Sequence, residues 1–332
     1  MMTTTSRPSP RRRAPFAIAL AAAGAIALTS CGLRLDTGPE GPSPASVAET
    51  HRQDAAIQAQ NLAETTRAVA ETETDPSVLE ALDAVAAGLD EQVEALGGVW
   101  VAWPDGAPEG ESNRPVPEPA SASGLEDLRG LLTSSADEVV TVLTDVPATD
   151  QDLASVLTSV AVGRYLAAAE LPWEDGAEAA VEPAAPGADL IAGVADGPTV
   201  RALDQAHYFA QTIAAREDDA EAAERATNLQ VLIDAALAAG APDTREPAYP
   251  WPDGEAVTYR IEAEQDLLDQ WIFLATTAPG QYRADLVDAA VDSALTLASL
   301  GEDPGALPGL PGSAPDAESA SGETVTGETA TG

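Results

Sequence analysis

The stretch LQVLIDAALAAGAP, residues 229–242, decides the fold class of this chain. Its apolar residues recur every three or four positions, which is the spacing of one face of an α-helix. These residues are Leu229, Leu232, Ile233, Ala236 and Leu237. Gly240 and Pro242 follow them, and a glycine followed by a proline is typical of a helix C-terminus. The stretch therefore predicts an amphipathic helix that ends before Gly240.

Three other segments of the second half have the same apolar spacing. They are residues 200–213, 257–275 and 286–297, and Pro279 ends the second of them. Runs of alternating β-branched residues, which would indicate strands, are almost absent. Four amphipathic helices within about a hundred residues are typical of a four-helix bundle. The sequence therefore predicts an all-α fold.

The first half of the chain repeats this plan. The tetrapeptide WPDG occurs at residues 103–106 and again at 251–254, a shift of 148 positions. Residues 58–65 resemble residues 205–212 at a shift of 147 positions. Internal matches at a nearly constant shift indicate a repeated structural unit.

A third match concerns the proline that ends the third helix of each predicted unit. Pro147 corresponds to Pro279 at a shift of only 132 positions, which predicts a longer connection inside the first unit. Three matches in the same order predict a tandem duplication. Each unit is expected to hold a helix pair, a long connection with the WPDG turn, and a second helix pair. One long crossover of this kind is the ferritin-like topology.

The second half also resembles a known family. Three segments carry the resemblance: LDQAHYFAQTIAARE at residues 203–217, PAYPWPDGEAV at 247–257, and IEAEQDLLDQWIFLATTAPGQYR at 261–283. They resemble the ferritin-like domain of unknown function found in exported lipoproteins of high-GC Gram-positive bacteria. The resemblance covers residues 199–301, and the first unit looks like a more divergent copy. It implies two tandem ferritin-like bundle units and names no activity.

The N-terminus predicts an exported protein. All 16 basic residues of the chain are arginine, and four of them lie within the first 13 positions. An uncharged run follows at residues 14–33, with an apolar centre at residues 16–28. A positive segment before a short apolar one is typical of a signal peptide. The apolar centre is too short for a membrane-spanning helix, which needs about 20 such residues.

The signal ends in LTSCG, residues 28–32, which resembles the lipobox of bacterial lipoproteins. In that family the cysteine receives a diacylglyceryl group and becomes the new N-terminus, with palmitate as a typical acyl group. We expect Cys31, the only cysteine of the chain, to carry this lipid, and two acyl chains suffice for stable anchoring. The alternative is an ordinary signal peptide with an incidental cysteine. The export route stays open, because Pro15 stands where a twin-arginine signal has an apolar residue.

The charge of the chain limits its partners. Asp and Glu number 55, and the net charge is −39 at pH 7. This charge argues against binding to nucleic acid or to anionic lipid head groups. Residues 312–332 are acidic, low in complexity and free of large apolar side chains, which predicts disorder. The expected domains are a signal peptide at 1–30, a tether at 31–46, a first bundle unit at 47–175, a linker at 176–198, a second bundle unit at 199–301 and a disordered tail at 302–332.

The second unit contains one candidate metal site. His207 lies on the apolar stripe of its helix with Asp204 one turn before it, and Glu264 interrupts the stripe of another helix. Ferritin-like di-iron bundles use four carboxylates and two histidines, so these three residues are an incomplete set. Gln60 and Leu132 stand at the positions equivalent to His207 and Glu264 in the first unit. A site for iron or manganese is therefore the alternative hypothesis here.

Trp103 and Trp251 begin the two WPDG turns, in which proline and glycine suit the backbone of a tight turn. We expect these tryptophans to cap the open end of a bundle, with a ligand pocket as the alternative. The sequence as a whole favours a non-enzymatic binding or scaffolding module without a resident cofactor. It is expected to lie on the extracytoplasmic face of the cell membrane, with another envelope protein as its partner.

Overall fold

The computed structural model describes residues 45–113, 115–172, 186–251 and 256–310. Within these residues the chain is helical and contains no β-strand, which confirms the predicted all-α class. Residues 103–113 belong to one compact unit, and the described helices belong to another. These helices are α1 Val47–Ala70, α2 Pro76–Ala95, α3 Leu125–Asp145, α4 Gln151–Glu170, α5 Ala188–Val194, α6 Gly197–Glu217, α7 Ala220–Ala238, α8 Ala256–Thr277 and α9 Arg283–Ser299, with a 3-10 turn η1 at Gly280–Tyr282 before α9.

The helix ends follow from the residues found there. Asp75 precedes α2, and its carboxylate accepts a hydrogen bond from the backbone N–H of Ser77 (2.9 Å), which satisfies a free donor of the first turn. Asp219 does the same for Ala222 at the start of α7 (3.0 Å). At the other end of α7, Gly240 has a φ of 94°, a left-handed conformation that glycine adopts without strain. The predicted end of this helix before Gly240 is therefore confirmed.

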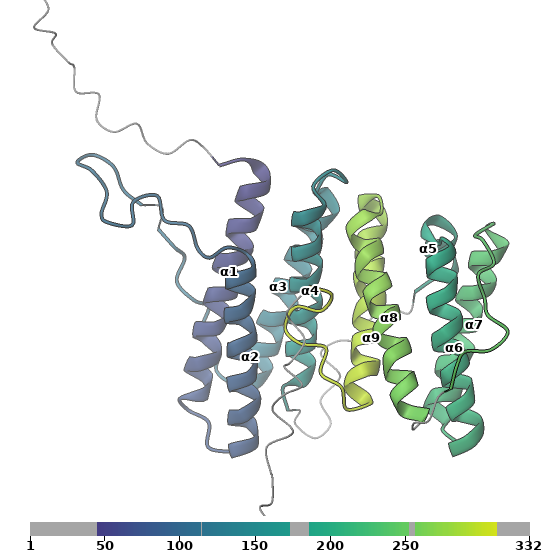
Figure 1. The fold of residues 1–332 in the computed structure, drawn as a ribbon. Helices are drawn as coiled ribbons and strands as arrows, with labels where there is room; N and C mark the ends of the chain where they lie inside the picture. Colours follow the sequence, from purple (N-terminus) through teal and green to yellow (C-terminus); the bar gives the residue numbers. More distant parts are fainter. Residues whose placement is uncertain (1–44, 114, 173–185, 252–255, 311–332) are drawn as a thin grey trace, which may run out of the picture. The chain divides into compact units, whose positions relative to one another are not determined.

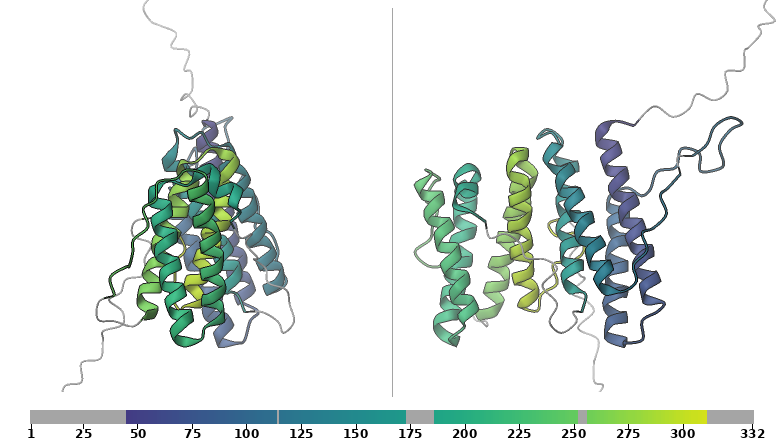
Figure 2. Two further views of the ribbon diagram at one scale, coloured as in Figure 1. Left: turned by 90° about the vertical axis from the view of Figure 1, so that its right-hand side faces the viewer. Right: turned by 180° about the vertical axis from the view of Figure 1, so that it is seen from behind.

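The helices pack as four antiparallel pairs. The pairs are α1 with α2, α3 with α4, α6 with α7, and α8 with α9. Figure 1 shows them side by side, with the α8–α9 pair between α3–α4 and α6–α7, and Figure 2 shows the same order from behind. Each half thus contributes two pairs, and the second pairs of the two halves face one another.

In the first half, the connection between α2 and α3 returns along α1. Near the start of α1, Gln53 donates to the carbonyl of Trp100 (3.3 Å) and accepts from its N–H (2.9 Å). Near the end of α1, Thr65 donates to the carbonyl of Ala120 (2.8 Å). Helix α2 therefore ends beside the start of α1, and α3 begins beside the end of α1. Both helices run antiparallel to α1, so α2 and α3 run in the same direction.

The second half has the same arrangement. Thr244, in the connection after α7, donates to the carbonyl of Gly197 at the start of α6 (2.5 Å). Further on, Tyr249 donates to the carboxylate of Asp204 in the middle of α6 (2.9 Å). The predicted order of helix pair, long connection and helix pair is therefore present in both halves. The relationship to ferritin-like bundles stays a prediction.

A shared hydrophobic core joins the two halves. Helix α4 packs against α8 and α9, and one continuous cluster of buried side chains includes residues from all three helices. Arg283, at the start of α9, is fully buried, and its Nη1 donates to the carbonyls of Leu143 (2.8 Å) and Val146 (2.7 Å). This arginine ties the start of α9 to the end of α3.

Two segments outside the predicted bundles are also packed. Helix α5 lies inside the predicted linker 176–198, and its Ile191 is fully buried. After α9, Ala306 lies against α2 and α4, where Gln92 donates to its carbonyl (3.2 Å), Gly309 lies against Ile272 on α8, and Leu307 is buried. Residues 302–310 were predicted to belong to the disordered tail, but this part of it is packed. Gly88 and Gly163 have no side chain and so leave room for Ala306 on α2 and α4.

Several predicted features lie outside the described residues. They are the signal peptide, Cys31, most of the tether and the tail from residue 311 onward. Among the helices that are described, none is long and apolar enough to cross a membrane.

Candidate functional site

The three candidate metal ligands lie in separate environments. Glu264 is fully buried, as its place on an apolar stripe predicts, and both of its oxygens accept from Arg225. The two N···O distances are 3.0 and 2.8 Å, and Arg225 also bonds to Asp292 on α9. Burial disfavours the charge of Arg225, but the attraction and hydrogen bonds of Glu264 and Asp292 together outweigh it and raise the pKa of Arg225. Glu264 therefore belongs to an internal ion pair.

Asp204 holds the connection that returns along α6. Its carboxylate accepts from the hydroxyl of Tyr249 (2.9 Å) and from the backbone N–H of Glu246 (3.2 Å). Burial and this hydrogen bond raise the pKa of Tyr249, so its hydroxyl remains a donor. The role of Asp204 in the structure is thus to fix the crossover.

His207 is half-buried beside a shallow groove between α6 and α7, which is lined mainly by alanine and glutamine side chains. Burial lowers the pKa of His207, and the charges of Asp204 and Asp234 offset this effect only in part. The described residues include no group of three or more His, Cys, Asp or Glu side chains arranged to hold a metal ion. The metal site at Asp204, His207 and Glu264 stays a prediction, and the geometry of the described residues does not support it.

The two WPDG tryptophans have different neighbours. The ring of Trp251 packs against those of Phe209 (5.9 Å between centroids) and Tyr259 (6.0 Å), and the guanidinium of Arg216 lies 4.2 Å from its centre. This cation–π contact and the ring packing agree with a role in closing the bundle. Residues 252–255, the rest of that turn, are outside the described part of the chain.

Trp103, in the smaller compact unit, begins a tight turn. Its carbonyl accepts from the backbone N–H of Gly106 (3.2 Å), and Gly106 has a φ of 105°, as the WPDG motif predicts. The side chain of Asn113 closes the loop by accepting from the N–H of Trp103 (2.8 Å) and donating to its carbonyl (3.0 Å). Within this unit, Trp103 therefore marks a turn.

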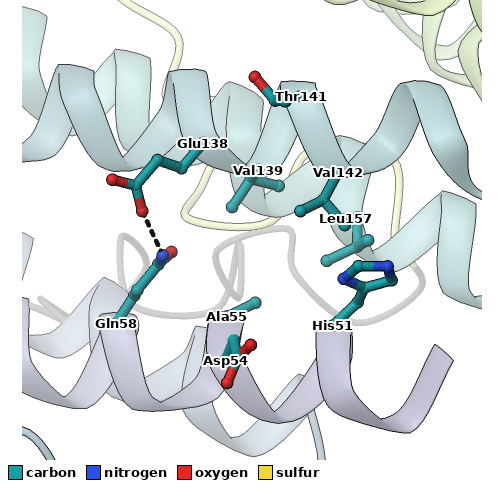
Figure 3. A pocket seen from close by; sticks show the side chains of 9 residues that line it. All are labelled: His51, Asp54, Ala55, Gln58, Glu138, Val139, Thr141, Val142 and Leu157. Atoms are coloured by element: carbon teal, nitrogen blue, oxygen red, sulfur yellow. Dashed lines mark hydrogen bonds between the residues drawn. The ribbon is translucent and has the colours of Figure 1, made fainter. Parts of the chain in front are cut away.

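A second groove lies between α1 and α3, with α4 beneath it (Figure 3). Its volume is about 340 Å³, which is within the usual range of ligand pockets. Its apolar middle and polar ends are formed by His51, Asp54, Ala55, Gln58, Glu138, Val139, Thr141, Val142 and Leu157. Figure 3 shows Glu138 and Gln58 at one end, His51 at the other, and valine and leucine side chains between them.

A buried arginine under the groove fixes its polar end. Arg164 on α4 is fully buried, and its Nη1 donates to Oε1 of Gln58 (3.0 Å) and to the hydroxyl of Ser135 (2.7 Å). Gln58 in turn donates through Nε2 to the carboxylate of Glu138 (2.6 Å). Because Arg164 determines which end of the Gln58 amide faces inward, it also determines that an N–H group faces Glu138.

Arg164 has no carboxylate in direct contact among the described residues. Its Nε donates to Gln92 (3.2 Å), and its Nη2 donates to the carbonyl of Ala55 (2.9 Å). Burial lowers the pKa of Arg164, and the negative charge of Glu138 opposes that shift. The nearest compensation for this buried charge is thus a surface carboxylate, reached through Gln58.

This groove was not predicted from the sequence, although two signals were present. His51, Asp54 and Gln58 are three and four residues apart and so share one helix face. Arg164 interrupts the otherwise uncharged segment 153–169, which indicates a buried cation with a specific set of acceptors. Neither signal identifies α3 as the second wall.

Comparison with protein-family models, with characterised proteins and with solved structures gives no match for this chain.

Proposed function

We propose that this protein is a lipoprotein of the cell envelope, anchored through Cys31, whose helical unit is a non-enzymatic binding or scaffolding module. The observation that carries the binding role is the groove between α1 and α3, in which the buried Arg164 holds Gln58 and Glu138 in place. Side chains held in one geometry before a partner arrives lose less entropy on binding. The helical unit is proposed to be a tandem pair of ferritin-like bundles, and the two crossovers along α1 and α6 support that assignment.

The anchor is tested by acylation in a host that processes bacterial lipoproteins. The full chain should incorporate an alkyne-labelled palmitate and partition with membranes, because two acyl chains give stable anchoring. Cys31→Ser should lose both properties. A full chain without label would contradict the lipid anchor and leave the ordinary signal peptide as the explanation, and label that persists in Cys31→Ser would contradict Cys31 as the acylated residue.

The binding role is tested by site-specific photo-crosslinking in intact membranes. A photoreactive residue at Thr141, which is exposed at the edge of the groove, should crosslink to a discrete partner. The matched control carries the same residue at Glu80, an exposed position on α2 outside the groove. Equal crosslinking from the two positions, or none from Thr141, would count against the groove as the binding surface.

The non-enzymatic assignment has its own measurement. Elemental analysis of the purified chain should find no stoichiometric iron or manganese, because Glu264 is already paired with Arg225. Stoichiometric metal that disappears in His207→Ala would replace the proposal with a metal-binding or redox function.

A further inference from the structure

We propose that the groove between α1 and α3 binds the side chain of a lysine or arginine in a basic polypeptide segment. This inference rests on the proposed function, because it names the ligand class of the same groove. It follows from three features of the groove: its apolar middle, the carboxylates at its edge, and the position of Arg164.

The apolar middle suits the methylene stem of a long basic side chain. Val139 and Leu157 are buried at the base of the groove, and Val142 is partly buried beside them. Lysine and arginine bury their aliphatic stems along apolar surfaces while the charged group stays among polar atoms. A small inorganic cation would leave this apolar surface uncovered.

Two carboxylates at the edge suit the charged group. Glu138 is exposed at one end of the groove, and Asp54 lies on the opposite wall (Figure 3). Oε2 of Glu138 accepts from Gln58, whereas its Oε1 has no hydrogen-bond donor among the described residues. An arriving ammonium or guanidinium group can therefore donate to Glu138 without displacing an existing partner. Charge-assisted hydrogen bonds of this kind are roughly twice as strong as neutral ones.

Arg164 does not compete for the ligand. It is fully buried, and its donors already bond to Gln92, Gln58, Ser135 and the carbonyl of Ala55. It contacts Glu138 only through Gln58, so Oε1 of Glu138 remains open to a cationic ligand. His51 at the far end has two ring nitrogens and supplies no fixed negative charge.

A polypeptide is favoured over a free amine by the charge of the whole protein. The net charge of −39 attracts a segment with several positive charges far more strongly than a single cation. The groove then sets where one side chain of that segment inserts. Attraction of this kind should weaken as salt is added, because exposed charges are screened over about 8 Å at physiological ionic strength.

The experiment uses the two histidines as reporters. The full lipidated chain in detergent micelles, labelled only in histidine, gives separate imidazole NMR signals for His51 in the groove and His207 outside it. A hexalysine peptide and a hexaarginine peptide are the probes, and a fully acetylated hexalysine is the uncharged control. The basic peptides should shift the His51 signals in a saturable way and leave those of His207 nearly unchanged.

Two charge-matched variants separate the groove from general electrostatic attraction. Glu138→Gln removes the proposed acceptor charge, and Glu80→Gln removes an equal charge from an exposed position outside the groove. The Kd for hexaarginine should rise by about tenfold in Glu138→Gln, as expected for loss of a charge-assisted hydrogen bond, and by less than about twofold in Glu80→Gln. Equal effects of the two variants would overturn the inference.

The remaining outcomes distinguish this inference from the proposed function. Saturable shifts of His51 with the acetylated peptide but not with the basic peptides would overturn the ligand class and keep the groove as a binding site. If no peptide shifts His51 and Thr141 gives no crosslink in membranes, both proposals fail. If Thr141 crosslinks specifically while the basic peptides leave His51 unchanged, only the cationic ligand is overturned.

Discussion

Arg225 in the second half and Arg164 in the first half have their charges balanced in different ways. In the second half, Arg225 contacts Glu264 directly, so the buried charge is balanced inside the protein. In the first half, Arg164 contacts only amide, hydroxyl and carbonyl groups and reaches a carboxylate through Gln58. The second half thus contains an internal ion pair. The first half, with the same order of helices, contains a chain of hydrogen bonds from Arg164 through Gln58 to Glu138 at the surface groove.

The two halves differ in charge at one pair of positions that the internal sequence match relates. A shift of 132 positions relates Leu132 to Glu264, and both side chains are fully buried. The position is therefore an interior one in each half, and it needs a partner only where it carries a charge. The difference teaches that two halves with the same order of helices can both pack an interior position while only one of them has an open polar surface. The predictions below test this contrast.

The largest effect should come from breaking the closed ion pair. Glu264→Ala leaves Arg225, whose side chain is only 12% exposed, beside a cavity with Asp292 as its remaining carboxylate. Removing one partner of a buried pair costs about 3–5 kcal/mol, so the free energy of unfolding should fall by this amount. Denaturant unfolding followed by circular dichroism measures it.

The control replaces both partners. Arg225→Met combined with Glu264→Leu restores apolar packing and resembles the first half, where leucine occupies the equivalent position. Because such replacements of buried pairs are often neutral, this double variant should be about as stable as the parent. A loss below about 1 kcal/mol for Glu264→Ala alone would show that Arg225 reaches solvent when its partner is gone.

A smaller effect is expected from Arg164→Met. This change removes the donors to Gln92, Ser135 and Ala55, but it also removes a buried charge that has no carboxylate beside it. The two consequences oppose one another, so we expect a loss of about 2 kcal/mol, less than for Glu264→Ala. If the two variants were equally destabilised, the proposed difference between the halves would be wrong.

The same variant gives a second measurement at the groove. Without Arg164, Oε1 of Gln58 keeps only the hydroxyl of Ser135 as a donor, so the amide that faces Glu138 is held less firmly. Crosslinking from Thr141 should therefore fall in Arg164→Met even at temperatures where the protein remains folded. Unchanged crosslinking would show that the groove does not depend on the buried arginine.

The third prediction concerns the segment 302–310, which crosses from the second half onto the first. A Cβ atom at Gly163 would lie 2.1 Å from the carbonyl oxygen of Ala306, so Gly163→Ala should displace this segment and cost about 1–3 kcal/mol. Gly130→Ala on α3 is the matched control, because nothing lies within 4 Å of its Cβ. It should gain about 0.5–1 kcal/mol from higher helix propensity. Similar effects of the two variants would contradict the packing of residues 302–310.

The apolar spacing of the sequence predicts much of this fold because helix faces and helix ends are local properties. Leu229, Ile233 and Ala236 are buried as expected, and Gly240 follows the helix in a left-handed conformation. Glu264 was correctly expected in the interior for the same reason. Its partner was not identified, because spacing along one helix does not reveal which residue of another helix faces it.

The groove depends on relations that are not local. It exists because α1 packs beside α3, whose residues lie about 80 positions further along the chain, as the bond between Gln58 and Glu138 shows. The sequence also led us to group Asp204, His207 and Glu264, since all three lie near apolar stripes. In the structure, the bonds of Asp204 to the crossover and of Glu264 to α7 direct them to different partners. Shared hydrophobic spacing alone did not distinguish these environments.

The smallest effect should come from making the second half more like the first at position 207. Burial lowers the pKa of His207 below the ordinary imidazole value, so between pH 7 and 5 the unfolded chain binds a proton that the folded chain binds less readily. The free energy of unfolding should therefore fall as the pH drops through this range.

His207→Gln introduces the residue found at the equivalent position 60 and should remove that part of the fall. The difference should be less than about 1 kcal/mol, because solvent screens a half-buried group. Parallel unfolding curves of parent and variant at pH 7 and pH 5 measure it, since His51 contributes equally to both proteins. A parent that gains stability relative to His207→Gln at pH 5 would mean that the charges of Asp204 and Asp234 outweigh burial.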